Sequence, residues 1–159
     1  MKNIFVSEKK KTKYAFLAYL IVLGDLVIVK FDGNVQRVVE TIQRNMDGRK
    51  KGYWNLSLVP LRTIRSSLSS DIEILRFSLF TNIVVFLPMG FFIAYLLQKP
   101  SFLKVVGICL LIIISIEGIQ FFACLGVFDV DDILLNTIGC MIGYCVYQIA
   151  ERQHRICFH

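Results

Sequence analysis

Residues 77–97 read FSLFTNIVVFLPMGFFIAYLL, a stretch of 21 residues without a charged side chain. As an α-helix, this stretch is long enough to cross the roughly 30 Å hydrocarbon core of a bilayer. Two more apolar stretches follow at residues 105–128 and 133–150, and Glu117 is the only charged residue within them. The sequence therefore predicts a protein built from membrane-spanning helices.

The composition of the whole chain agrees with this prediction. Of its 159 residues, 55% are apolar and 19% are charged, whereas soluble domains have about 45–50% and about 25%. The mean hydropathy is +0.61. These values argue against a water-soluble enzyme, and the net charge of +6 then suits the anionic face of a membrane better than nucleic acid.

A fourth candidate span, residues 14–31, is weaker because it contains Asp25 and Lys30. Its lysine-rich start also resembles a secretory signal peptide, but Asp25 and a bulky run stand where a small-residue cleavage site is expected. We interpret it as a retained first span. The predicted fold is an all-α integral membrane protein with about four transmembrane helices, at about residues 14–31, 77–97, 103–127 and 132–150.

The distribution of Lys and Arg predicts the orientation in the membrane. Segments 1–13, 98–104 and 151–159 hold nine of these residues in 29 positions, whereas segments 32–76 and 129–132 hold eight in 49. Cytoplasmic segments carry the higher density of Lys and Arg. We therefore expect a basic cytoplasmic N-terminus, a cytoplasmic C-terminal tail and an external loop at residues 32–76.

The external loop contains two amphipathic helical patterns, the second of which begins just after Pro60. Their apolar positions are Val35, Val38, Val39 and Ile42 in the first pattern, and Leu61, Ile64, Leu68, Ile72 and Leu75 in the second. Tyr53 and Trp54 between them suit the aromatic belt of a membrane interface. We expect the loop to lie on the outer membrane surface; the alternative is a disordered loop.

Polar side chains inside the apolar stretches are the candidate functional residues. They are Asp25, Asn82, Glu117, Gln120 and Asn136. At about 1.5 Å of helix per residue, all five fall in the outer half of the bilayer. A carboxylate in lipid is costly and usually marks a functional group that faces the protein interior. The alternative is that Glu117 is protonated, or paired with polar neighbours, merely to hold helices together.

The last span carries a stripe of polar and small residues on one helix face. Asp132, Asn136, Gly139 and Gly143 recur every three or four residues, and two glycines four apart form a small-residue packing pattern. Few residues separate the third and fourth spans, so these helices should be antiparallel neighbours. We expect the third span to pack against the glycines, with Glu117 facing Asn136.

Motifs for a cofactor or a nucleophile are absent from the sequence. The five cysteines form no C-x-x-C pair, so neither a zinc site nor a disulfide framework is expected. The competing hypothesis is an intramembrane enzyme, with Glu117 as general base and Asp129, Asp131 and Asp132 as ligands of a divalent cation. These three acids equally suit the N-terminus of a helix, which carboxylates cap and stabilise.

Three motifs in series resemble those of the VanZ-like family of bacterial membrane proteins. The first is Glu117-x-x-Gln120 followed by Gly126, Asp129, Asp132, Asn136, Gly139 and Gly143; the second is NIVVFLPMGF at residues 82–91; the third is Asn55-Leu56 followed by Pro60-Leu61. Many members carry Arg at the position of Gly126, so this chain lacks a cation that in those members is a candidate for binding lipid phosphate.

The resemblance implies a protein of the bacterial cytoplasmic membrane that lowers susceptibility to lipid-tailed glycopeptides such as teicoplanin. The candidate functional cluster is Asn82, Glu117, Gln120, Asp129, Asp132 and Asn136, and the candidate helix-packing residues are Pro88, Gly90, Gly139 and Gly143. We expect an outer-leaflet polar cleft that acts on a membrane lipid or a lipid-linked cell-wall intermediate. The lipoglycopeptide itself and other membrane proteins are further candidate partners.

Overall fold

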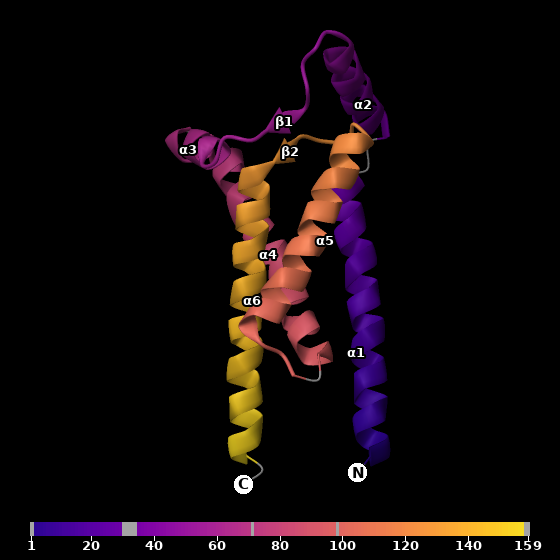
Figure 1. The fold of residues 1–159 in the computed structure, drawn as a ribbon, viewed down its shortest axis with the longest axis vertical. Coiled ribbons are helices and arrows are strands. Elements are labelled where there is room, and N and C mark those ends of the chain that lie inside the picture. Colours follow the sequence, from indigo (N-terminus) through magenta and orange to yellow (C-terminus); the bar gives the residue numbers. More distant parts are fainter. Residues whose placement is uncertain (1, 30–34, 71, 98, 158–159) are drawn as a thin grey trace.

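The computed structural model of the chain describes residues 2–29, 35–70, 72–97 and 99–157 and consists almost entirely of helices (Figure 1). The helices are α1 (Lys2–Leu23), which a π-helix η1 (Gly24–Val29) continues, α2 (Val35–Lys50), α3 (Arg62–Ser69), α4 (Glu73–Leu96), α5 (Phe102–Phe122) and α6 (Val130–Cys157). Two short strands, β1 (Leu56–Ser57) and β2 (Phe128–Asp129), pair in parallel. The predicted all-α class is confirmed.

Within the described residues, three helices are long and apolar enough to cross a membrane. They are Leu75–Leu96, Phe102–Phe122 and Val130–Gln153, and they correspond to three of the four predicted spans. The predicted span 14–31 is not among them, so a fourth span is not confirmed. Its described part comprises the end of α1 and all of η1, and residues 30 and 31 lie outside the described residues.

Helix α1 nevertheless lies alongside the apolar helices (Figure 1). The Tyr19 hydroxyl donates a hydrogen bond to the backbone carbonyl of Val85 in α4, at 2.8 Å. The rings of Phe16 and Tyr19 lie 5.5 and 5.9 Å from the ring of Phe92. The long helices α1 and α6 run along one axis, and α4 and α5 are inclined between them (Figure 1). Both termini lie at one end of this bundle, and α2, α3, β1 and β2 lie at the other.

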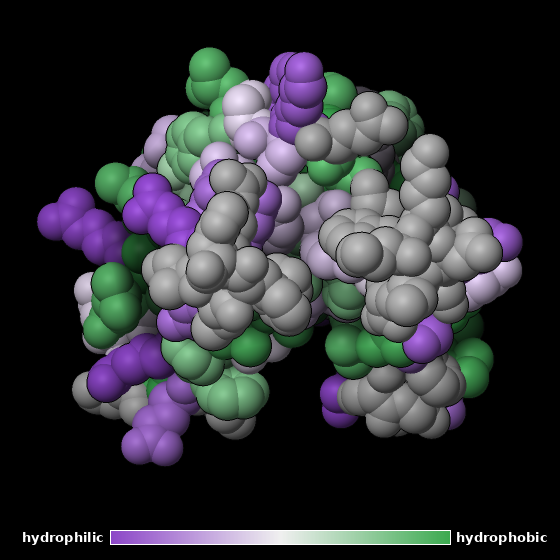
Figure 2. All heavy atoms as spheres, turned by 90° about the horizontal axis from the view of Figure 1, so that it is seen from below, coloured by the Kyte–Doolittle hydropathy of each residue, from purple (hydrophilic) through white to green (hydrophobic). Residues whose placement is uncertain are grey.

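The end that carries both termini is shown in Figure 2. There α1 and α6 project beyond the turn between α4 and α5 (Figure 1). Around the rim of this view, hydrophobic side chains alternate with hydrophilic ones that project outwards. Along the helices themselves, large apolar side chains such as those of Leu103, Leu111 and Phe122 are exposed. Exposed apolar side chains on helices of this length are what a lipid environment favours.

The most extensive helix contact is between α4 and α6, and three glycines form its centre. A β-carbon added at any of the three would overlap a backbone carbonyl oxygen of the facing helix. The facing pairs are Gly139 with Ile83, Gly143 with Leu87, and Gly90 with Cys140. Pro88, the other candidate packing residue, lies inside α4 next to Leu87. We call this contact the glycine seam.

The expectation that Gly139 and Gly143 pack against the third span is therefore wrong, because they face α4. Helices α5 and α6 are joined by a short link and are inclined to one another (Figure 1). They meet further along, where the ring of Phe102 lies 5.8 Å from that of Tyr144, but Gly139 and Gly143 themselves are turned towards α4. A short connection makes two helices neighbours, but their crossing angle decides which faces come into close contact.

Two helix ends differ from the predicted boundaries. Helix α5 ends at Phe122 rather than near residue 127, because Cys124 adopts a left-handed backbone conformation with φ of 58°. Helix α6 continues to Cys157, well beyond the predicted end of the span at residue 150. The first amphipathic pattern of the loop lies in α2, whereas the second is divided between α3 and the start of α4.

Candidate functional site

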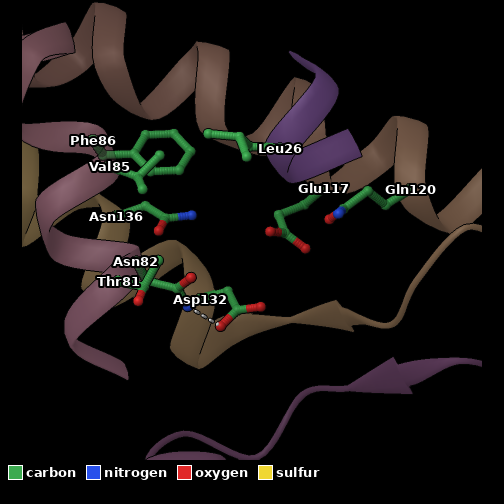
Figure 3. A pocket seen from close by; sticks show the side chains of 9 residues that line it. All are labelled: Leu26, Thr81, Asn82, Val85, Phe86, Glu117, Gln120, Asp132 and Asn136. Carbon is green, nitrogen blue, oxygen red and sulfur yellow. Dashed lines mark hydrogen bonds between the residues drawn. The ribbon is translucent and has the colours of Figure 1, made fainter. Parts of the chain in front are cut away.

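Most of the predicted polar cluster lines one cavity of about 150 Å³ near the α5–α6 link (Figure 3). The lining residues are Leu26, Thr81, Asn82, Val85, Phe86, Glu117, Gln120, Asp132 and Asn136. They come from η1, α4, α5 and α6, so helices distant in sequence build the cavity together. Asp129 is not among the lining residues, and neither is Asp25, which is exposed.

Helix α5 contributes Glu117 and Gln120 from its most buried face. These two residues lie about one turn apart, and each is only 1% exposed. In Figure 3 the Glu117 carboxyl group points into the space between α5 and the polar side chains of α4 and α6. A carboxyl group so deeply buried is stable only when it is protonated, hydrogen-bonded or paired with a cation.

Helices α4 and α6 supply the opposite side of the cavity. The side-chain amide of Asn82 donates a hydrogen bond to the Asp132 carboxylate, with Nδ2 and Oδ1 2.6 Å apart (Figure 3). Asn136 follows Asp132 by one helical turn and is 2% exposed. Its Oδ1 atom has no hydrogen-bond partner among the described residues. Buried acceptors nearly always have a partner, so an unsatisfied oxygen on a residue that lines the cavity is unusual.

The described lining residues contain two carboxyl groups and no Lys, Arg or His. Leu26, Val85 and Phe86 supply an apolar part of the wall (Figure 3). The Thr81 hydroxyl donates a hydrogen bond to the Phe77 carbonyl of its own helix at 2.9 Å. The cavity therefore combines carboxyl and amide side chains with an apolar surface.

Asp129 and Asp131 hold the segment at the start of α3 instead of lining the cavity. The Asp129 carboxylate accepts hydrogen bonds from the Thr63 hydroxyl at 2.6 Å and from the Asp131 amide at 2.9 Å. Asp131 is fully buried, and its carboxylate accepts backbone hydrogen bonds from Leu61, Thr63 and Ile64 at 2.6 to 3.1 Å. This carboxylate satisfies amides at the start of α3 that the helix itself leaves without partners.

The hypothesis that Asp129, Asp131 and Asp132 hold one divalent cation is therefore contradicted by their positions. The first two bind the start of α3, and Asp132 lines the cavity. Among the described residues, no group of three or more His, Cys, Asp and Glu side chains is arranged to hold a metal ion.

A second polar cluster fastens the loop to the end of α5. The Arg49 guanidinium donates hydrogen bonds to Oδ1 of Asn55 at 2.9 and 2.7 Å, and to the Phe121 carbonyl. Its central carbon lies 4.6 Å from the Phe121 ring centroid and 5.7 Å from that of Trp54. Asn55 in turn donates to the Gly126 carbonyl at 2.5 Å. We call these five residues the arginine clamp.

The sequence did not single out Arg49, because its pattern does not distinguish this residue from the adjacent Lys50 and Lys51. The signal that pointed to this region was Asn55, the first residue of the third motif. Asn55 is buried, and both polar groups of its side-chain amide are hydrogen-bonded. The oxygen accepts from Arg49, and the nitrogen donates to the Gly126 carbonyl.

Comparison with known sequences places this architecture in a family. The sequence profile of the VanZ/LLP1 family matches residues 16–151. The chain belongs to the VanZ/LLP1 family. The predicted membership of the VanZ-like family is thus confirmed.

Among curated relatives of this VanZ/LLP1 chain is Protein VanZ of Enterococcus faecium. The two are 25% identical over 134 residues, which make up 84% of this chain and 71% of the relative. No solved structure matches the chain significantly.

The VanZ/LLP1 match includes the last eight residues of α1 and every residue that lines the cavity. The structure also shows that the three motifs are joined by side-chain hydrogen bonds. The joined pairs are Asn55 with Gly126 and Asn82 with Asp132. Leu61 of the third motif donates to Asp131, which lies between two residues of the first motif. Motifs that are separated in the sequence thus form the cavity and its supporting contacts within one VanZ/LLP1 domain.

Proposed function

We propose that this VanZ/LLP1 protein lowers the susceptibility of a bacterium to lipoglycopeptide antibiotics such as teicoplanin by binding or moving a lipid or lipid-linked component of the cell envelope. The observation that carries the proposal is the polar cavity, in which a buried Glu117 and an unsatisfied acceptor of Asn136 lie inside an otherwise apolar helix bundle. Polar groups at such positions in a membrane protein usually mark a functional site.

The proposed location is the bacterial cytoplasmic membrane, with both termini in the cytoplasm. The high density of Lys and Arg near the termini supports this orientation. The cavity lies towards the opposite end, since Asn136 is six residues, about 9 Å, from the start of α6. In this orientation the cavity opens within the outer leaflet, where envelope lipids and their linked intermediates meet external antibiotics.

The size of the cavity supports a small polar headgroup as its occupant. Its volume of about 150 Å³ is below the roughly 300–1,000 Å³ of sites for drug-sized ligands. A complete glycopeptide is therefore too large, and we propose an indirect effect through the envelope component. Teicoplanin has an acyl tail that inserts into the membrane, whereas vancomycin lacks one, so a change in the outer leaflet should affect teicoplanin more.

The chemistry of the lining supports binding more than catalysis. Among the described residues that line the cavity, none is Ser, Cys or His, which are the most common nucleophiles and bases of hydrolytic sites. Glu117 is therefore proposed as a ligand-binding group.

Deleting the gene and restoring it as wild type or as Glu117→Gln tests the proposal. Susceptibility to teicoplanin and to vancomycin is measured side by side, together with the amount of protein in the membrane. We expect Glu117→Gln to lose the protection against teicoplanin at a normal protein level. The matched control is Ser115→Ala, because Ser115 is exposed on the same helix. Full protection by Glu117→Gln would overturn the proposal.

A further inference from the structure

The cavity is closed at one end and open at the other. Four lining side chains at the closed end are at most 2% exposed: Phe86, Glu117, Gln120 and Asn136. The remaining lining residues are partly exposed, and Leu26 of η1 is 52% exposed. In Figure 3 Leu26 and Thr81 lie on opposite sides of the space, and they belong to η1 and α4. The exposed side chains therefore place the opening between these two helices.

The course of α1 explains why the cavity opens on this side of α4. Helix α1 contacts α4 at Tyr19, whose hydroxyl donates to the Val85 carbonyl. After Leu23 the chain continues as the π-helix η1, which contacts α5. On the other side of α4, the hydrogen bond from Asn82 to Asp132 joins this helix to α6. The side of α4 towards η1 is therefore the side that remains open.

The depth of the opening places it beside lipid tails. The apolar part of α4 begins at Leu75, and Thr81 and Val85 follow it by six and ten residues, or about 9 and 15 Å of helix. The hydrocarbon core of a bilayer is about 30 Å thick. An opening at this depth, between a membrane-spanning helix and its neighbour, is reached from the hydrocarbon region.

The surface of α4 beside the opening is apolar and exposed. Phe77, Phe80 and Val84 are 69%, 62% and 45% exposed, and their spacing of three and four residues places them on one face of the helix. Phe77 also precedes Thr81 by one turn, so the apolar face adjoins the edge of the cavity. A polar interior thus continues directly into an apolar outer surface.

We propose that a membrane lipid enters the cavity sideways from the bilayer, between η1 and α4, an inference that rests on the proposed role of the cavity in binding an envelope lipid. The polar headgroup occupies the cavity, and an acyl or isoprenoid chain of the same molecule lies outside it, along Phe77, Phe80 and Val84. A ligand held in this way never leaves the membrane, so a water-soluble molecule is not its natural occupant.

Fluorescence quenching tests whether the opening faces lipid. Trp54→Phe removes the single tryptophan of the chain, and Leu26→Trp then places one at the edge of the opening. The reference is Leu111→Trp in the same background, since Leu111 is 69% exposed within the apolar helix α5. Phosphatidylcholine brominated on its acyl chains quenches from the hydrocarbon, and iodide quenches from water.

We expect brominated lipid to quench the tryptophan at position 26 nearly as strongly as the one at position 111, and iodide to have little effect on either. Stronger quenching at position 26 by iodide than by brominated lipid would show that the opening leads to water, and would overturn the inference.

Blocking the opening tests whether lipid uses it. Thr81→Trp fills the edge of the cavity, Thr81→Val keeps the size of the side chain, and Val84→Trp places the same ring on the exposed face of α4. Each protein is reconstituted with a polar lipid extract of bacterial membranes, and native mass spectrometry in mild detergent measures the lipid retained per chain.

We expect Thr81→Trp to retain about tenfold less lipid than the wild type, the effect of about 1.4 kcal/mol of lost affinity, whereas Thr81→Val and Val84→Trp retain the wild-type amount. Thermal unfolding checks that each variant is folded. Leu26→Trp blocks the opening from the opposite side if Thr81→Trp does not fold. Wild-type retention by a folded blocking variant, or no retained lipid in the wild type, would overturn the inference.

The result is separable from that for the proposed function. If the blocking variants lose the lipid but Glu117→Gln still protects against teicoplanin, the proposed function fails and the sideways entry of lipid stands. If Glu117→Gln loses protection while the folded blocking variants keep the lipid, the proposed function stands and the ligand enters by another route.

Discussion

Gly139 of α6 lies against the backbone carbonyl oxygen of Ile83 in α4, with no space for a β-carbon between the two helices. The same relationship recurs one turn later between Gly143 and Leu87, so the glycine seam extends along both helices. Close backbone approach of this kind stabilises helix pairs in membranes, where burial of apolar surface from water does not drive association. The seam positions Asn82 next to Asp132, and so determines one side of the cavity.

A single methyl group should therefore disrupt the seam. We expect Gly139→Ala to destabilise the protein by about 1–3 kcal/mol, the usual effect of overpacking a close contact, and to reduce the amount of folded protein. Thermal unfolding in detergent measures the effect. The matched control is Gly107→Ala in α5, because a β-carbon there meets no atom within 4 Å. Equal stability of the two variants would show that the seam is not a close contact.

The capping of α3 by Asp131 can be tested by proteolysis. Asp131→Ala removes the acceptor for three backbone amides, and loss of a helix cap costs about 0.5–2 kcal/mol. We expect α3 to unfold locally more often, and trypsin to cleave faster after Arg62 and Arg65.

The control for this experiment is Asp47→Ala, which removes an exposed ion pair with Lys50. Exposed ion pairs contribute little to stability, so cleavage after Arg62 and Arg65 should keep its wild-type rate in this variant. Wild-type cleavage in Asp131→Ala as well would mean that the cap does not hold α3.

The arginine clamp contains the single tryptophan of the chain, Trp54. Arg49→Ala should change the intensity and wavelength of Trp54 fluorescence, because the cation near its ring is lost. Lys51→Ala, which changes an exposed cation in the same segment, should leave the emission unaltered. Emission of Arg49→Ala identical to that of the wild type would indicate that Arg49 does not approach the ring in solution.

The proposed orientation, with both termini in the cytoplasm, predicts a labelling pattern in intact cells. A cysteine at position 51, in the loop, should react with a membrane-impermeant thiol reagent, whereas one at position 153, near the C-terminus, should react only after the cells are permeabilised. The wild-type chain gives the background from its own cysteines. The reverse pattern would place the cavity in the inner leaflet and remove its access to external antibiotics.

The polar cavity could be predicted from sequence because a polar group inside an apolar span is stable only when it faces the protein interior. This requirement applies to Glu117, Gln120 and Asn136 separately, and it brings them together whatever the order of the helices. The partner of the glycine stripe could not be predicted in the same way. Both the second and the third span were compatible with Gly139 and Gly143. In the structure the glycines are turned towards α4, whereas α5 contacts α6 through Tyr144.

The separate roles of Asp129, Asp131 and Asp132 also depended on tertiary structure. These residues lie where β2 ends and α6 begins, so no single periodicity relates their directions. Asp131 points to α3 because the loop returns to the α5–α6 link through the pairing of β1 with β2. The sequence places three acids at a helix start, but it does not indicate that a distant segment supplies their donors.

The glycine seam also constrains the order in which the protein is made. Helices α4 and α6 are its two partners, and α5 lies between them in the chain. During synthesis from the N-terminus, α4 enters the membrane two helices before the surface that it packs against exists. During that interval, lipid or the translocation machinery must cover the face of α4 that carries Gly90. The cavity is completed only when α6, which supplies Asp132 and Asn136, has been made.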